Sequence, residues 1–582
     1  MTFLTPMLGS APRRSKWPAV FAALAAAAVI TTIASVLLIF WTSPFIEVDG
    51  TPRRLRLNEF WYYAFGHSQV DAGLARRLGL AALCGAAASL VAAIIAWRRT
   101  PMTDCAVTMP HDGEPRLHHG EYASRELNKR LATRYGRKSE PGLWLVPGVR
   151  LPREAETNFI LIVGDKGSGK STIMRALASQ AISRRDRVLL HCVKGDVTQS
   201  FGPDEAVLIA AHHAEGWAWD AAADLKDEAA FMDLAAAVIP TSGSSAFWSQ
   251  SARAVFVDIL RDLVNESGHS GWTFAELADR LLTDPQIIRE RIDRLDLSAS
   301  PLIEAGPEGL STTTFGVMAT LWSAALNGVR PLALAWKDTP ADRRFSVRRW
   351  LAGGGQRTVI IQTAPEYQEL STLVSTALLT RIINGVSDPS LKTDSRRRVT
   401  LALDEFHSLG RIPRIEDAMA VGREKGLVVI AALQNLAQLQ AVYGNRSQVV
   451  QDLFGLRIFL ALAAGASADL ASALIGRRTL IWRERNLDPN VKSPYKYERA
   501  ERFVVSPTEF QRDLGIRQIG KNAADPSHKI ARAIISGLGD VYQLDWPLTI
   551  WRKKRDGFVL AKWMTRARVR AGRPDQRASP KG

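Results

Sequence analysis

The stretch that decides the fold is Asn158-Phe-Ile-Leu-Ile-Val163, which Gly164-Asp-Lys-Gly-Ser-Gly-Lys-Ser171 follows at once. The first six residues predict a buried strand, and the residues from Thr172 to Ser183 have helical periodicity. A glycine-rich loop between a strand and a helix is typical of sites in which backbone N–H groups hold phosphate. The stretch therefore predicts a phosphate-binding P-loop.

Each residue type in this loop has a chemical reason to be there. Gly164, Gly167 and Gly169 let backbone N–H groups curl around phosphates, and Lys170 reaches the β and γ oxygens. Ser171, at the helix N-terminus, is a ligand for Mg²⁺. We predict that the chain binds ATP and Mg²⁺. The expected nucleotide contacts are Gly164, Asp165, Lys166, Gly167, Ser168, Gly169, Lys170, Ser171 and Thr172.

Polar side chains follow two further apolar runs. Asp404 and Glu405 come directly after Val399–Leu403, and we expect Asp404 to hold Mg²⁺ through water while Glu405 orients and polarises the attacking water. The alternative is an ordinary acidic turn. Gln434 ends the run Leu427–Leu433 and is placed to sense the γ-phosphate if that strand lies between the other two. Its alternative is a solvated glutamine at a strand end.

Strand and helix patterns alternate after residue 140, which indicates an α/β fold. Lys170 and Asp404 are 404 − 170 = 234 residues apart, more than a βαβ core needs between these motifs. Helical spacing fills much of that interval. We therefore predict an inserted all-α domain at 224–343, between core segments 141–223 and 344–550.

The N-terminal part predicts a membrane anchor. Residues 17–41 contain no charged residue, and at 1.5 Å per residue they extend about 37 Å, enough to cross a bilayer with some tilt. A second uncharged run, 78–97, lies between arginine pairs. We predict a transmembrane hairpin over residues 1–99 and a linker at 100–140, with both termini in the cytosol because ATP is there. A cleaved signal peptide is the alternative for the first run.

Composition narrows the class of partner. The 582 residues exceed what one core usually holds, and 75 lysines and arginines against 58 acids give a net charge of +17. That excess favours nucleic acid or acidic lipid as a partner. Three cysteines, without C-x-x-C or histidine spacing, predict neither a disulfide framework nor a zinc site.

The positive charge is concentrated at the C-terminus. Residues 552–582 contain eleven lysines and arginines against two aspartates, so 11 − 2 gives +9 of the total. Trp551 and Trp563 interleave with the charges, as in segments where phosphates meet cations and bases stack on rings. We predict that the basic tail 551–582 binds single-stranded DNA. A solvated tail, or one touching acidic lipid, is the alternative.

Several runs together resemble the type IV secretion coupling proteins of the TraD/TraG family. They are Leu403-Asp-Glu-Phe-His-Ser-Leu-Gly-Arg-Ile-Pro413, Val421-Gly-Arg-Glu-Lys-Gly426, Leu433-Gln-Asn-Leu-Ala-Gln-Leu439 and Lys194-Gly195-Asp196. The resemblance covers roughly residues 140–550 and implies a RecA-like core that carries a helical domain. It further implies a hexameric, multi-pass ATPase of the bacterial inner membrane that receives relaxase-bound single-stranded DNA, or proteins, and drives them into a secretion channel.

The same resemblance assigns one further catalytic residue. In the family an arginine about twenty residues past the acidic pair acts across the subunit interface, and Arg423 has the matching place. The alternative is a surface arginine on a helix. Asp165 and Lys166 depart from the family pattern, because they place charges where small or hydroxyl residues are usual.

Two other classes of protein fit part of the pattern. A chromosome translocase of the FtsK kind shares the anchor and motor, but it usually has more spans, a long linker and a C-terminal winged helix. A membrane receptor that uses nucleotide only to assemble would not need Glu405 and Gln434 beside Lys170, Ser171 and Asp404. The sequence therefore favours a DNA-translocating ATPase, of double- or single-stranded DNA, bound to the relaxosome and the channel.

Overall fold

The computed structural model describes most of the chain, and its residues form two compact units. The described residues are 17–42, 46–48, 51–53, 59, 72–99, 114–241, 246–268, 271–306, 309–388, 397–412, 415–485, 495–520 and 525–564. The first unit comprises 1–126, 476–504 and 540–543, and the second comprises 127–475, 505–539 and 544–582.

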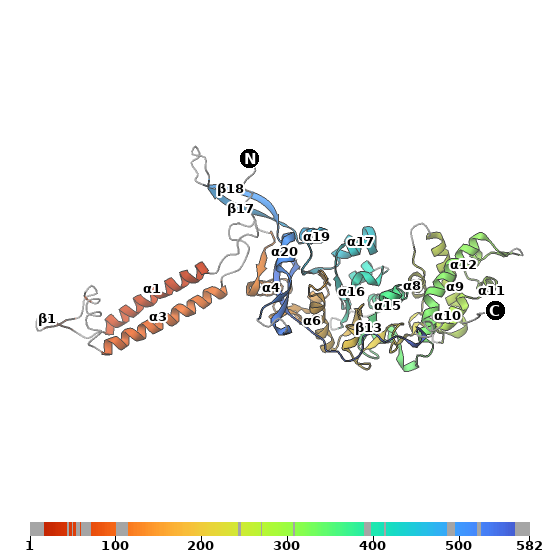
Figure 1. Cartoon of the computed structure of the whole chain (residues 1–582), viewed down its shortest axis with the longest axis horizontal. Coiled ribbons are helices and arrows are strands. Elements are labelled where there is room, and N and C mark those ends of the chain that lie inside the picture. The colour runs from red at the N-terminus through yellow and green to blue at the C-terminus, as the bar shows by residue number, and fades with distance from the viewer. Residues whose placement is uncertain are drawn as a thin grey trace, which may run out of the picture. The chain divides into compact units, whose positions relative to one another are not determined.

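Two long helices dominate the first unit. Helices α1 (Trp17–Thr42) and α3 (Ala72–Arg99) lie side by side, as Figure 1 shows. They approach closely at Gly85, where an added β-carbon would lie 3.2 Å from the Thr31 hydroxyl oxygen. Other apolar side chains of the pair point outward, as at Leu83, which is 72% exposed. Across the described residues, no helix combines the length and the apolarity that crossing a membrane requires.

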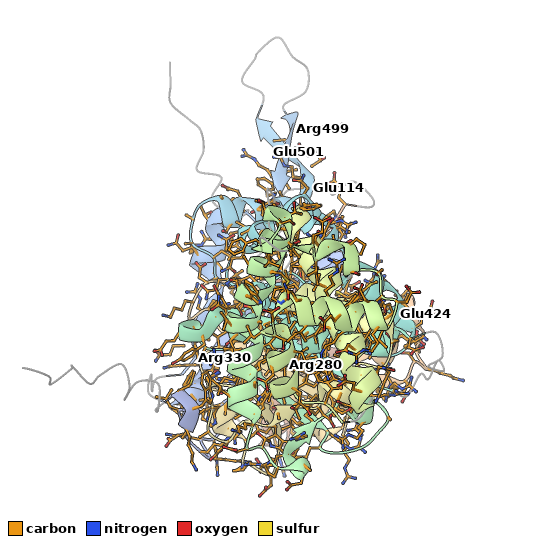
Figure 2. All side chains as sticks on the ribbon, turned by 90° about the vertical axis from the view of Figure 1, so that its right-hand side faces the viewer. Glu114, Arg280, Arg330, Glu424, Arg499 and Glu501 are labelled. Carbon is orange, nitrogen blue, oxygen red and sulfur yellow. The ribbon has the colours of Figure 1, made fainter. Side chains whose placement is uncertain are left out.

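The rest of the first unit is built from short strands and a hairpin. Strand β3 (Leu117–His119) pairs in parallel with residues 541–543 of β21 (Asp540–Pro547), and β17 (Arg477–Arg485) pairs antiparallel with β18 (Tyr495–Phe503). Arg499 and Glu501 lie on this hairpin in Figure 2. Helix α4 (Gly120–Tyr135) begins in this unit.

A twisted sheet forms the centre of the second unit. Its strand order is β8-β13-β7-β14-β15-β6-β16-β20, with β19 paired to β20. The strands from β8 to β16 are parallel, and β20 is antiparallel to β16. Their bounds are β6 Ile160–Val163, β7 Arg187–Cys192, β8 Val207–Ile209, β13 Thr358–Gln362, β14 Val399–Leu403, β15 Leu427–Leu433, β16 Leu456–Phe459, β19 Gly515–Gln518 and β20 Lys529–Leu538.

The central strands are buried along their whole length because helices cover a parallel sheet on both faces. This explains why these strands are apolar runs rather than alternating patterns. Helices α6 (Lys170–Ser183) and α16 (Ile415–Glu424) pack directly against these strands. The other helices that follow strands of this sheet are α15 (Gln368–Ser387), α17 (Ala437–Tyr443), α18 (Ser447–Asp452) and α19 (Ala466–Ile475). Since the strands are parallel, their carboxyl ends meet at one edge, where ligands bind in such sheets.

A group of helices interrupts the sheet between β8 and β13, and Figure 1 shows α9 to α12 gathered at one end of the unit. Its members are α7 (Ala221–Asp224), α8 (Glu228–Val238), α9 (Ala246–Ser267), α10 (Phe274–Leu281), α11 (Pro285–Arg294), α12 (Thr312–Ala324) and α13 (Arg330–Trp336). The interval is not all-helical: Ala305–Gly306 pairs with Gly309–Leu310 as a minimal two-residue ladder. A strand this short leaves no hydrophobic period in the sequence, so periodicity cannot predict it.

Ion pairs hold three of these helices together. Arg280 of α10 pairs with Asp262 and Glu266 of α9, and Arg291 of α11 pairs with the same two acids at 3.2 and 3.1 Å. In Figure 2 these helices face the viewer and Arg280 lies among them. The insertion therefore has its own polar framework.

Candidate active site

The P-loop follows β6 at the carboxyl edge of the sheet. Gly167 and Gly169 have φ of +80° and +108°, a left-handed backbone that glycine adopts without strain. Gly164 has no room for a side chain, because a β-carbon there would lie 2.6 Å from the Ser168 hydroxyl oxygen. The loop is thus closed tightly and leads into α6, whose first turn contains Lys170, Ser171 and Thr172.

Lys170 folds back over its own loop. Its ammonium group donates to the carbonyl oxygens of Gly164 at 2.6 Å and Asp165 at 2.9 Å. Burial lowers the pKa of Lys170, while the carboxylates of Asp404 and Glu405 act in the opposite direction. The lysine is therefore a buried cation that faces two acids of another strand.

The charged residues of the loop have separate surroundings. The Asp165 carboxylate accepts a hydrogen bond from the Ala463 N–H, and the Asp165 N–H donates to the Ala461 carbonyl at 2.8 Å. Asp165 thus ties the P-loop to the segment after β16, which gives this departure from the family pattern a structural reason. Lys166 is exposed.

Asp404 and Glu405 directly follow β14 and face the P-loop lysine. Asp404 is largely buried, and burial, followed by the nearby charges of Asp196 and Glu405, raises its pKa to about 6. Glu405 has φ of +49°, a left-handed conformation that is strained for a non-glycine residue. Its N–H donates to Asp404 Oδ1 at 3.1 Å. Strain at the second acid fits a functional turn better than an ordinary one.

Gln434 lies where the sequence argument requires. Strand β15 pairs with β14 on one side and β6 on the other, so Gln434 emerges between the acidic pair and the P-loop. Its amide Nε2 donates to Glu405 Oε1 at 3.2 Å. Gln434 is therefore held by a neighbouring side chain rather than being a solvated strand end.

Sequence reasoning assigned no role in the site to three residues of and after β7. The Lys194 ammonium lies 3.7 Å from Glu405 Oε1, and Asp196 pairs with Arg175 of α6. His191 contacts the Asp404 carbonyl oxygen through Nδ1, and burial lowers its pKa to about 4, so the ring is neutral and Nδ1 donates. The signal available was the Lys194-Gly195-Asp196 run at the end of a strand. Only the order of strands, with β7 beside β14, brings it to the site.

Comparisons with known proteins agree with this fold and show the family. A family model described as the type IV secretion-system coupling protein DNA-binding domain matches residues 144–501, more than half of the chain. The chain belongs to this family. Coupling protein TraD of Escherichia coli (strain K12) is 24% identical over 334 residues, which cover 56% of this chain and 45% of TraD. The match thus spans less than half the length of that relative.

Solved structures of another coupling protein share the architecture. The bacterial conjugative coupling protein TrwBΔN70 is similar with a TM-score of 0.61 at 20% identity, over 78% of this chain and 97% of that chain. TrwB in complex with ADP and Mg²⁺ is similar with a TM-score of 0.60 at 20% identity, over 78% and 97%. This likeness confirms the prediction of a P-loop α/β core with an inserted helical domain.

The structure does not bring Arg423 of this coupling protein to its own P-loop. Its guanidinium donates to the Leu453 carbonyl oxygen at 2.5 Å and lies over the Phe159 ring, 5.1 Å from the centroid. Phe159 precedes β6, whereas the P-loop follows it, so the arginine and the loop are at opposite ends of the strand. Any contact of Arg423 with a nucleotide therefore needs a second copy of the chain.

The two tryptophans of the basic tail lie against the motor core, and binding of single-stranded DNA by the tail stays a prediction. Trp551 donates its indole N–H to the Ser179 hydroxyl oxygen at 2.8 Å, and Trp563 donates to the Ala211 carbonyl at 2.9 Å. Both indoles are engaged in packing, because residues 551–564 lie on the motor core instead of extending into solvent. The rest of the predicted tail, residues 565–582, lies outside the described residues.

Proposed function

We propose that the chain is an ATPase that couples ATP hydrolysis to the transfer of DNA into a type IV secretion channel. The supporting observation is the meeting of Lys170, Asp404, Glu405 and Gln434 at one sheet edge, in a member of the coupling-protein family. A receptor that bound nucleotide only to assemble would not need the hydrogen bond between Gln434 and Glu405. Relatives of the same fold are known in complex with ADP and Mg²⁺ and with a non-hydrolysable ATP analogue.

One feature of the P-loop supports the binding of ATP and Mg²⁺. The Ser168 hydroxyl oxygen is buried and has no hydrogen-bond partner within the described part of the chain. A phosphate oxygen supplies such a partner, together with the N-terminus of α6. Mg²⁺, when bound, neutralises charge on the β and γ oxygens, and Ser171 and Asp404 are the residues that hold it. The nucleotide lies against Gly164, Asp165, Lys166, Gly167, Ser168, Gly169, Lys170, Ser171 and Thr172.

Hydrolysis follows from the positions of the remaining polar groups. Lys170 turns from the two loop carbonyls to the β and γ oxygens. Glu405 orients and polarises the attacking water, since Gln434 and Lys194 hold its carboxylate in place at 3.2 and 3.7 Å. Gln434 follows the strand between the acids and the P-loop. It senses whether a γ-phosphate is present and, through its hydrogen bond to Glu405, links this to the position of that carboxylate.

We include Arg423 as a residue that acts in trans within a homo-hexamer, because its own P-loop is out of reach. Arginines supplied across an interface raise phosphoryl-transfer rates by about 10³–10⁵. Inactive Lys170→Ala and Arg423→Ala chains, mixed at equal ratio, should recover part of the activity by pairing an intact P-loop with an intact arginine. Verified mixed rings that stay inactive would leave Arg423 in its packing role against Phe159.

The setting of this motor is also part of the proposal. The uncharged sequence runs and exposed apolar side chains such as Ile30 (66%) and Leu83 (72%) support the proposal of a multi-pass anchor in the bacterial inner membrane, with the motor in the cytosol. The described helices do not by themselves have the length and apolarity that a span requires. Single- and double-stranded DNA, the relaxase in its relaxosome, and components of the secretion channel are the partners.

A transfer assay tests the proposal. In donor cells that depend on this chain for conjugation, Lys170→Ala should abolish DNA transfer at an unchanged protein level, because it removes a phosphate-binding cation without core packing. The exposed Lys138, which lies outside the site, is the control: Lys138→Ala should retain most of the transfer. Transfer at the parent frequency in the Lys170→Ala strain would refute the assignment of this site.

A further inference from the structure

The first residues of the predicted tail form a segment that lies on the motor core, here called the docked segment (residues 551–564). Trp551 donates to Ser179 of α6, and Arg555 Nε donates to the Thr198 carbonyl oxygen at 3.0 Å. The Arg555 side chain is only 8% exposed, so its contacts with the core are buried, unlike those of a surface ion pair. Backbone hydrogen bonds add to these: Lys554 N–H to Gln199 O, Ala561 N–H to His212 O and Ala214 N–H to Val559 O.

At its middle the docked segment touches the turn after β7, here called the 194–196 bend. The two segments are in contact at Gly557 and Gly195. A β-carbon on Gly557 would lie 2.5 Å from the Gly195 carbonyl oxygen. A β-carbon on Gly195 would in turn lie 2.8 Å from the Phe558 ring. Gln362, at the end of β13, donates to the Gly557 carbonyl at 2.9 Å and fixes the height of the segment. No side chain separates the two backbones, so a shift of one displaces the other.

The 194–196 bend carries the two charged residues that face the acidic pair. The Lys194 ammonium lies 3.7 Å from Glu405 Oε1, and the Lys194 side chain is 58% exposed. A long side chain in solvent has many rotamers, so its place beside Glu405 depends on where the backbone of the bend is held. Asp196 is fixed more firmly by Arg175 of α6. The docked segment contacts Gly195, the residue between Lys194 and Asp196.

We infer that the docked segment positions Lys194 and Asp196 beside Glu405 and Asp404, and that Gly557 is a positioning residue for ATP hydrolysis. The inference rests on the proposed function. It predicts that ATP turnover and nucleotide binding respond differently to changes in the segment, since the P-loop backbone and Lys170 make none of these contacts. Turnover should depend on the contact between the segment and the bend, while nucleotide binding should not.

Gly557→Ala tests this in the 582-residue chain. The added methyl must push the segment away from the Gly195 carbonyl, and a misplacement of 1 Å in an active site costs roughly 10²-fold in rate. We expect kcat to fall at least about tenfold, with the Kd of a fluorescent ATP analogue within about twofold of the parent value. Gly202→Ala is the matched control, because a β-carbon there comes no closer than 3.6 Å to Glu205, and it should keep the parent kcat.

Phe558 supplies a second test that does not depend on the glycine. Its ring is 51% exposed, so Phe558→Ala should fold, and it should also lower kcat, whereas Phe558→Leu should restore most of it. If Gly557→Ala unfolds, this pair decides. Parent turnover in both Gly557→Ala and Phe558→Ala, or an equal loss of nucleotide affinity, overturns the inference. A parent chain without ATPase activity contradicts the proposed function as well, so the two failures are distinguishable.

Discussion

Glu405 combines backbone strain with a charge. Its left-handed conformation costs a non-glycine residue about 1–2 kcal/mol, and glycine recovers this at an entropic cost of about 0.5–1 kcal/mol. Glu405→Gly should therefore be more stable than Glu405→Ala by about 1 kcal/mol, or roughly 2 °C in Tm, although neither hydrolyses ATP. Thermal unfolding of the two variants measures this. Equal Tm values would show that the strain costs nothing at this position.

The charge of the same residue can be tested separately. Glu405→Gln keeps the shape of the side chain and its place beside Gln434 but removes the group that polarises water. We expect ATP binding to be retained and kcat to fall by about 10²–10⁴, the range for a positioned general base. Single-turnover hydrolysis with bound ATP is the measurement, and Glu424→Gln, at an exposed position of α16, is a control. Undiminished turnover in Glu405→Gln would remove this carboxylate from the mechanism.

At the residue level, the sequence predicted those side chains that directly follow an apolar strand. Asp404 and Gln434 have this signal, because the carboxyl ends of parallel strands share an edge, and Lys170 has the signal of the glycine-rich loop after β6. His191 did not, since it lies inside β7 and contacts the Asp404 carbonyl only through the neighbouring strand. Its environment depends on strand order, which local patterns do not contain.

Asp224 joins the helical insertion to the core. Its buried carboxylate accepts hydrogen bonds from the Trp219 indole, the Ser346 hydroxyl and the N–H groups of Val347 and Arg348, at 2.6–2.9 Å. Asp224→Ala leaves these donors without their acceptor, and we expect it to destabilise the second unit by about 3–5 kcal/mol. Denaturant unfolding of the purified chain checks this, with the exposed Asp342→Ala as control. A loss below about 1 kcal/mol would show that water replaces the carboxylate.

Elements differ in how far local patterns predict them. The long helices of the insertion follow from 3.6-residue periodicity, and the short parallel pair β9 (Ala218–Trp219) with β12 (Arg344–Phe345) closes the interval near its predicted limits. Local patterns do not predict the contacts of the docked segment, because these contacts join residues that are distant in sequence. Trp551 and Ser179, for example, are 372 residues apart.

For the molecule as a whole, the charge of the C-terminus separates into two parts. Residues 551–564 dock on the core, whereas 565–582 contain six lysines and arginines against one aspartate. Removal of 565–582 should leave DNA-free ATPase near the parent rate and flatten the salt dependence of single-strand binding, by at most about 0.7 per cation in the log–log slope. Removal of 551–582 should lower turnover as well. An unchanged salt slope in the shorter truncation would exclude these charges from DNA binding.

The measurement that tests the central claim most directly is steady-state ATP hydrolysis by the purified 582-residue chain, with and without single-stranded DNA. The account predicts Mg²⁺-dependent hydrolysis that single-stranded DNA stimulates, and its loss to background in Lys170→Ala under both conditions. Hydrolysis by the parent chain that does not exceed that of Lys170→Ala, with or without DNA, would contradict it.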